Sequence, residues 1–160
     1  MALSGFTLEI SSPVAARILF NAGVVDGHNL GPKIMPQVIV STEILEGDGG
    51  VGTIKQNNFT DAMPFKYIKE RIDILDKEKL EYKITVIEGG QLGKKVESAS
   101  NHFTVEPASD GGCVCKVSFE YKALPGIEFT DEEIQFAKNG MTGMFKAVEA
   151  YVLANPDAYA

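Results

Sequence analysis

The spacing of apolar residues divides the chain into a long strand-forming middle and helical segments on either side of it. Residues 5–11 alternate between polar and apolar side chains, which predicts a first strand with one buried face. From residue 37 to residue 122 strand-type segments return, separated by short turns rich in glycine, aspartate and lysine. Strands joined by such tight turns pair antiparallel, so we expect one antiparallel sheet with a face open to solvent.

Two short helices are predicted between the first strand and this strand-rich region. Ser12 can cap a helix and Pro13 suits its first turn, so we expect the first helix to begin there and to end at Gly23. A second helix should begin at Asp26 and end at Pro36.

A long helix is predicted near the end of the chain. Thr130 and Glu133 have the spacing of a capping box, and the helix should continue to about Asn155, just before Pro156. Its apolar residues recur at helical spacing and comprise Ile134, Ala137, Met141, Met144, Phe145, Val148, Tyr151 and Val152. Because this apolar face must be covered, and the sheet is the only large apolar surface that the sequence offers, the predicted fold class is α+β.

Composition limits the function without identifying it. The chain has 160 residues, which predicts a single domain over 1–160, and its 22 acidic and 15 basic residues give a net charge of −7 that argues against polyanion binding. Cys113 and Cys115 lack the companion pair that a zinc site needs, so we expect reduced thiols, no metal and no cofactor. The first residues do not resemble a signal peptide, and no apolar run approaches the ~18 residues that cross a bilayer; we therefore expect a cytoplasmic protein without a membrane partner.

A glycine-rich segment, Gly47, Gly49, Gly50 and Gly52 followed by Lys55, is reminiscent of a phosphate-binding loop. A nucleotide loop requires a helix after the glycines, and here a strand follows. We interpret the segment as a hairpin loop in which glycines adopt positive φ. A weaker alternative remains open, in which successive amides form an anion nest beside the lysine.

Four segments in register carry a family resemblance: 46–55 (EGDGGVGTIK), 64–76 (PFKYIKERIDILD), 86–95 (VIEGGQLGKK) and 147–159 (AVEAYVLANPDAY). Together they resemble the Bet v 1-like family, and more narrowly the intracellular plant pathogenesis-related proteins of class 10. The resemblance implies the helix-grip fold: a seven-stranded curved antiparallel sheet gripping a long C-terminal helix, with two short helices after the first strand. It also implies a large hydrophobic cavity for small plant metabolites.

The candidate ligand-binding residues combine inward strand positions, apolar helix positions and positions that match the family's cavity lining. They are Phe59, Phe65, Tyr67, Tyr82, Ile84, Asn101, Phe103, Cys115, Val117, Gly140, Met141 and Met144. Tyr67, Tyr82 and Asn101 are expected to orient a ligand through hydrogen bonds. Gly140, with Gly143, either leaves room for a ligand or allows close helix–sheet packing. Gly23 and Asn57 differ from the Phe and Ile of birch-type relatives, which predicts a wider and more polar pocket.

The expected function is binding or carriage of small hydrophobic metabolites or hormones, resembling cytokinins, flavonoids, sterols or fatty acids, in plant defence or stress. We expect a monomer, with a dimer as the alternative, and kinship with plant allergens. Binding is favoured over catalysis. A purely structural domain with a filled core is a further alternative. His28 is expected to be a polar residue of a short helix or its loop, and His102 to lie on the outer face of the sheet.

Three other activities known in relatives require particular residues. A ribonuclease, the enzymatic alternative and the only one that would bring a nucleic-acid partner, would use Lys55, Glu97, Glu149 and Tyr151. Norcoclaurine-synthase-like condensation is disfavoured, because of its tyrosine, glutamate and lysine only the glutamate is retained, as Glu70. Abscisic-acid reception with phosphatase inhibition is also disfavoured, because 60–65 (TDAMPF) and 89–95 (GGQLGKK) lack the gate and latch sequences of that branch.

Overall fold

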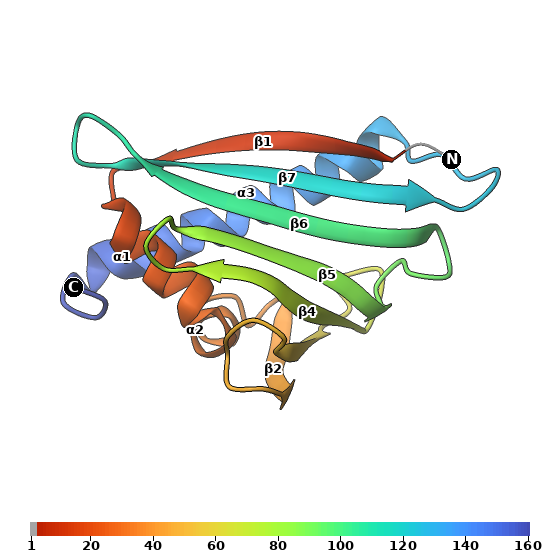
Figure 1. The fold of residues 1–160 in the computed structure, drawn as a ribbon, viewed down its shortest axis with the longest axis horizontal. Helices are drawn as coiled ribbons and strands as arrows, with labels where there is room; N and C mark the ends of the chain where they lie inside the picture. The colour runs from red at the N-terminus through yellow and green to blue at the C-terminus, as the bar shows by residue number, and fades with distance from the viewer. Residues whose placement is uncertain (1–2) are drawn as a thin grey trace.

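The computed structural model describes residues 3–160, and its elements follow the predicted order (Figure 1). The strands are β1 (Ser4–Ser12), β2 (Ile39–Glu46), β3 (Ile54–Phe59), β4 (Tyr67–Asp76), β5 (Glu81–Gly89), β6 (Val96–Pro107) and β7 (Cys113–Ala123). The helices are α1 (Ala16–Phe20), a π-helical turn η1 (Asn21–Val25), α2 (Gly27–Ile34) and α3 (Asp131–Ala154).

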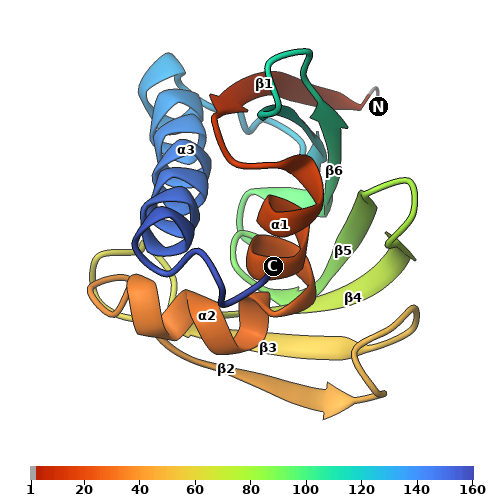
Figure 2. The same cartoon turned by 90° about the vertical axis from the view of Figure 1, so that its left-hand side faces the viewer.

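All seven strands form one antiparallel sheet in the order β1-β7-β6-β5-β4-β3-β2. The sheet curves strongly, and α3 lies across its open side while α1 and α2 occupy one end between helix and sheet (Figure 2). The α+β fold and the seven-stranded curved sheet gripping a long helix are thereby confirmed.

The first helix departs from its predicted bounds. Ser12 still pairs with Cys113 as the last residue of β1, so its backbone is extended and α1 begins only at Ala16. At the other end the chain continues past Gly23 as the π turn η1. Gly23 faces α3 instead of ending a helix, since a Cβ placed there would lie 3.6 Å from the methyl groups of Val148.

The long helix begins as predicted. The Thr130 hydroxyl accepts a hydrogen bond from the Glu133 amide, and the Glu133 carboxylate accepts one from the Thr130 amide, each at 3.1 Å. Phe145, Val148 and Val152 are the buried residues of its apolar face. Among residues 3–160, no helix is both long and apolar enough to cross a membrane.

Candidate ligand-binding pocket

A pocket of about 190 Å³ lies at the end of the sheet where the short helices meet β2, β3 and α3. The π turn and α2 form one side, the inward-facing residues of β2 and β3 the other, and two residues of α3 complete it. Its lining residues are Ala22, Gly23, Gly27, His28, Leu30, Gly31, Ile39, Thr42, Lys55, Asn57, Phe59, Met144 and Val148. Most of these side chains are apolar or small, and polar groups enter mainly from the two strands.

Strand alternation places the polar groups of this wall. Lys55, Asn57 and Phe59 lie at every second position of β3 and therefore share the face that lines the pocket. Lys55 pairs in register with Glu70 of β4, so Glu70 also faces inward. The Asn57 amide donates to a Glu70 carboxylate oxygen at 2.9 Å, and the Thr42 hydroxyl donates to the Asn57 carbonyl oxygen at 2.8 Å. The chain Thr42–Asn57–Glu70 thus fixes the carboxylate behind the pocket wall.

Lys55 is the cation of this region. Its ammonium nitrogen lies 5.3 Å from the centre of the Tyr82 ring, and none of the ion pairs among residues 3–160 includes it. Burial lowers the pKa of Lys55. The interactions with Tyr82 and Glu70 raise it by more, so the pKa of Lys55 lies above its ordinary value. Burial also raises the pKa of Glu70, although Lys55 and the hydrogen bond from Asn57 act in the opposite direction.

Two buried polar side-chain atoms of the sheet have no hydrogen-bond partner among the residues that the structure describes. They are the Tyr82 hydroxyl on β5 and the side-chain oxygen of Asn101 on β6. Asn101 pairs in register with Ile84, two residues along β5 from Tyr82 on the same face, so the two groups lie on neighbouring strands. Each unpaired buried group costs about 1–3 kcal/mol, which a suitable ligand could recover.

Only two of the predicted ligand-binding residues, Phe59 and Met144, line this pocket. The centre of the molecule is instead packed by aromatic rings that run from sheet to helix. Tyr82 contacts Phe103 and Phe103 contacts Phe145, with 5.9 Å between ring centres in both pairs. We call these three residues the aromatic column.

The other predicted ligand-binding residues lie in the core, against a lining residue, or half-buried on α3. Ile84, Cys115 and Val117 are buried in the core, with 2%, 0% and 2% exposure. Phe65 packs edge-on against Phe59, with 5.6 Å between ring centres, and so lies behind a lining residue. Met141 is half-buried against the core cluster.

The structure corrects the placement of Tyr67. Its hydroxyl donates to the Glu88 carboxylate at 2.8 Å on the outer face of the sheet, where Lys69 also reaches Glu88 at 3.1 Å. The cause is strand parity, because Tyr67 and Lys69 share the face of β4 opposite to that of Glu70. Tyr67 therefore cannot orient a ligand in the interior in this conformation.

The helix glycines do not mark close packing against the sheet. A Cβ built at Gly140 or Gly143 would meet no atom within 4 Å, and both residues are exposed. Gly140 precedes Met144 by one turn, so it lies on the same side of α3 as a residue of the pocket. Gly143 precedes Phe145 by two residues, about 200° around the helix, and faces away from the core.

The four residues of the ribonuclease alternative are each engaged by a different partner. Lys55 approaches Tyr82, while Glu97 pairs with Lys122 at 3.2 Å. Glu149 pairs with Lys146 at 3.3 Å, and the Tyr151 hydroxyl accepts a hydrogen bond from Lys33 at 3.0 Å. None of these contacts joins two members of the set, so the structure does not assemble them into one site.

The glycine-rich segment is the loop between β2 and β3, and several of its amides donate to groups of the protein. The amide of Gly49 donates to the Thr53 hydroxyl at 2.9 Å, that of Gly50 to the Asp48 carboxylate at 3.0 Å, and that of Gly52 to the Ile72 carbonyl at 2.8 Å. The Thr53 amide donates to the carbonyl of Gly50 at 3.1 Å. Gly47, Gly49 and Gly52 adopt positive φ, whereas Gly50 does not. The amides of Gly49, Gly50 and Gly52 therefore donate within the protein, which argues against the anion-nest alternative.

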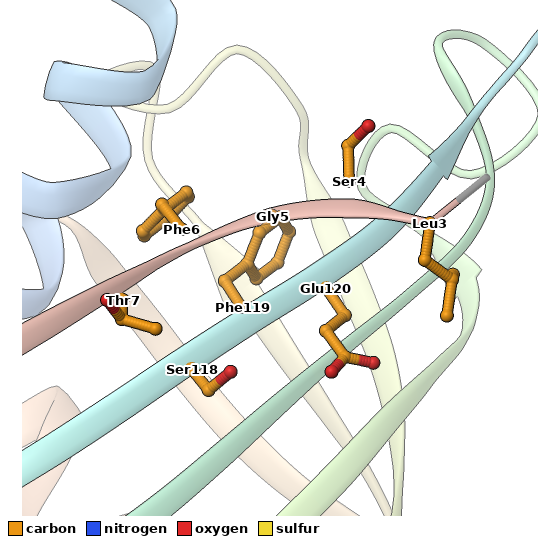
Figure 3. A pocket seen from close by; sticks show the side chains of 8 residues that line it. All are labelled: Leu3, Ser4, Gly5, Phe6, Thr7, Ser118, Phe119 and Glu120. Carbon is orange, nitrogen blue, oxygen red and sulfur yellow. The ribbon is translucent and has the colours of Figure 1, made fainter.

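A second hollow, of about 380 Å³, lies on the surface where β1 pairs with β7 (Figure 3). It is lined by Leu3, Ser4, Gly5, Phe6, Thr7, Ser118, Phe119 and Glu120. Gly5 allows β1 to approach β7 closely here, because a Cβ there would lie 2.1 Å from the Phe119 carbonyl oxygen. None of the predicted ligand-binding residues lines this hollow.

Sequence reasoning missed much of the pocket. His28 was expected only as a polar helix residue, yet it lines the pocket from α2, as Thr42 does from β2. Gly23 and Asn57, noted as departures from relatives, both line it. Alternation along β3 could have found Lys55 and Asn57 together with Phe59, whereas nothing local in the sequence indicates His28. His102 lies on the outer face as predicted, 2.6 Å from the Glu81 carboxylate.

Comparison with known proteins gives consistent matches along the chain. The family described as "Pathogenesis-related protein Bet v 1 family" matches residues 1–155. "Pathogenesis-related protein 1" of Asparagus officinalis is 48% identical over 160 residues, covering 99% of each chain. The crystal structure of Ara h 8.0201 superposes with a TM-score of 0.84 at 37% identity, covering 96% of this chain and 99% of that one. Norcoclaurine synthase from Thalictrum flavum, in complex with dopamine and hydroxybenzaldehyde, gives a TM-score of 0.76 at 26% identity, covering 96% and 88%.

Proposed function

The chain belongs to the pathogenesis-related protein Bet v 1 family, and on that premise we propose that it binds and carries small apolar plant metabolites or hormones. The proposed site is the pocket between the short helices, β2, β3 and α3. The protein acts by sequestering the ligand, in the setting of defence or stress, and carries out no chemistry on it. We retain the sequence-based predictions of a cytoplasmic location and a monomer.

One observation carries this proposal: an apolar pocket is lined by Lys55, which lies over the ring of Tyr82, a buried residue whose hydroxyl lacks a partner. Leu30, Ile39, Phe59 and Val148 supply apolar walls, so burying a ligand ring is favourable by about 25 cal/mol per Å² of apolar surface. A few polar groups in an otherwise apolar lining are typical of small-molecule sites. A domain that served only a structural role would be expected to satisfy such groups internally.

The size of the pocket ranks the ligand classes. Sites for drug-sized ligands occupy roughly 300–1,000 Å³, so a pocket of about 190 Å³ favours compact ligands. Cytokinin-like compounds fit this limit better than flavonoid-, sterol- or fatty-acid-like ones, because the aromatic column fills the space beyond it. The Thalictrum flavum enzyme, whose structure holds dopamine and hydroxybenzaldehyde, supports this scale, since both are single-ring compounds bound by a protein of the same fold.

The proposal is tested by displacement of a fluorescent hydrophobic dye, anilinonaphthalene sulfonate, with the cytokinin kinetin as competitor. We expect the protein to take up the dye and kinetin to displace it at micromolar concentration. Substitution Gly23→Leu should weaken both by at least about tenfold, because the new side chain enters the pocket beside Val148.

Gly143→Leu is the matched control, because it adds the same side chain to an exposed helix position with open space around it. It should leave dye and kinetin binding within about twofold of the wild type. Circular dichroism would verify that both variants are folded. Absence of dye and kinetin binding by the folded wild-type protein would refute the proposed function.

A further inference from the structure

We propose that the pocket selects small planar acids, with Lys55 as the charge partner of the ligand's carboxylate. This inference rests on the proposed function and specifies the ligand class of that same site. It starts from the charge state of the pocket wall. A cation lining a pocket without an ion-pair partner is left with unused hydrogen-bonding capacity, which an anionic ligand would fill.

Glu70, which pairs in register with Lys55 on the neighbouring strand, does not serve as its ion-pair partner. Glu70 is held by the Asn57 amide at 2.9 Å, and Asn57 is in turn held by Thr42. This holds Glu70 beyond ion-pair distance of Lys55, although the Glu70 charge still raises the pKa of Lys55. The ammonium therefore remains available on the pocket side.

A second hydrogen-bond donor, the Tyr82 hydroxyl, belongs to the residue beside the Lys55 ammonium. The Tyr82 hydroxyl is buried and partnerless, and the Lys55 ammonium lies over the ring of the same residue. A carboxylate has two acceptor oxygens, so one group can accept from both donors. His28 also lines the pocket, from the helix side.

The volume of the pocket limits the size of the ligand that carries the carboxylate. A pocket of about 190 Å³ is small for an organic ligand, so one ring with a short side chain suits it well. Leu30, Phe59 and Val148 provide the apolar surface for that ring. An arylpropenoic or arylacetic acid combines this ring with the required charge, whereas an amine of the same size would face Lys55 with a like charge.

Isothermal titration of trans-cinnamic acid and cinnamyl alcohol at pH 7 tests the inference, because the two compounds share a ring and chain and differ in the head group. We expect the acid to bind at least about tenfold more tightly than the alcohol, as a charge-assisted hydrogen bond gives. Lys55→Met should reduce this ratio to about one. Glu70→Gln keeps an acceptor for Asn57 but removes a competing negative charge, and should strengthen acid binding severalfold.

Lys69→Met is the matched control, since it removes the same charge from the outer face of β4, where Lys69 pairs with Glu88. It should leave the ratio of acid to alcohol affinity unchanged. Equal affinity of the wild type for acid and alcohol would overturn the inference while leaving the proposed function intact. An acid preference that survives in folded Lys55→Met would also overturn it. Failure of kinetin, acid and alcohol alike to bind would refute the proposed function itself.

Discussion

Phe103 links the sheet to the long helix, and replacing it with alanine tests whether the aromatic column both stabilises the fold and limits the pocket. A fully buried Phe→Ala change costs about 3–5 kcal/mol, and the half-buried position of Phe103 reduces this to about 2 kcal/mol. Its contacts with Tyr82 and Phe145, each with 5.9 Å between ring centres, add about 0.5 kcal/mol apiece, the low end of the range for aromatic pairs. We therefore expect Phe103→Ala to lower the free energy of unfolding by about 3 kcal/mol.

Urea denaturation followed by circular dichroism measures this loss directly. For a chain of this size the melting temperature should fall by roughly 6–12 °C, at about 2–4 °C per kcal/mol. A double-mutant cycle with Phe145→Ala isolates the contact between sheet and helix, and the coupling energy should be about 0.5–1.5 kcal/mol. A cost below about 1 kcal/mol, or no coupling, would show that this column does not hold the helix against the sheet.

The same variant should change ligand size preference. Removing the ring leaves a void next to Tyr82, on the interior side of the sheet where the pocket lies. We expect a steroid such as progesterone to displace the dye from Phe103→Ala more effectively than from the wild type. Unchanged displacement would mean that the column does not set the upper limit of ligand size.

Two further predictions concern the loop and the outer face. Gly47→Ala should destabilise the fold by about 2–3 kcal/mol, because a Cβ there lies 2.6 Å from the Thr53 hydroxyl at a φ of +92°. Gly49→Ala, where φ is +101° and nothing lies within 4 Å, should cost only about 1 kcal/mol in the same urea titration, and equal costs would contradict this account. Arg71 lowers the pKa of Asp73 through a hydrogen bond, so the stabilisation is complete above the ordinary pKa of an aspartate and is lost as pH falls through the lowered one. Asp73→Asn should therefore cost about 0.5–1 kcal/mol at pH 7 and nothing near pH 2, and a difference independent of pH would contradict the assignment.

The fold was predictable because several independent signals agreed. Alternation, turn composition and the capping box at Thr130 each gave the element that the structure contains. The start of α1 was not predictable from local preference, because Ser12 suits a helix cap but is used by β1 in its pairing with Cys113. Here a tertiary contact outweighs a local propensity that is worth only about 1 kcal/mol.

The candidate site was less predictable, and the errors have identifiable causes. Tyr67 was assigned from its match to the family's cavity lining, although its alternation with Glu70 on β4 already indicated the opposite face. The aromatic column was not foreseen because inward-facing rings on β5, β6 and α3 can either line a cavity or fill it, and only their distances decide. His28 joins the pocket through the path of the π turn, which local sequence preferences do not encode.

The glycine loop has a consequence for assigning function by short motifs. Thr53, with 0% exposure, anchors the loop by accepting from Gly49, while Gly52 and Ile72 tie it to a strand beyond its own hairpin. The glycines here form a tight loop whose amides bond to Thr53 and to the neighbouring strand. A search for nucleotide-binding motifs would therefore return a false match. Whether such a segment can receive a phosphate depends on where its N–H bonds point, which the letter pattern does not record.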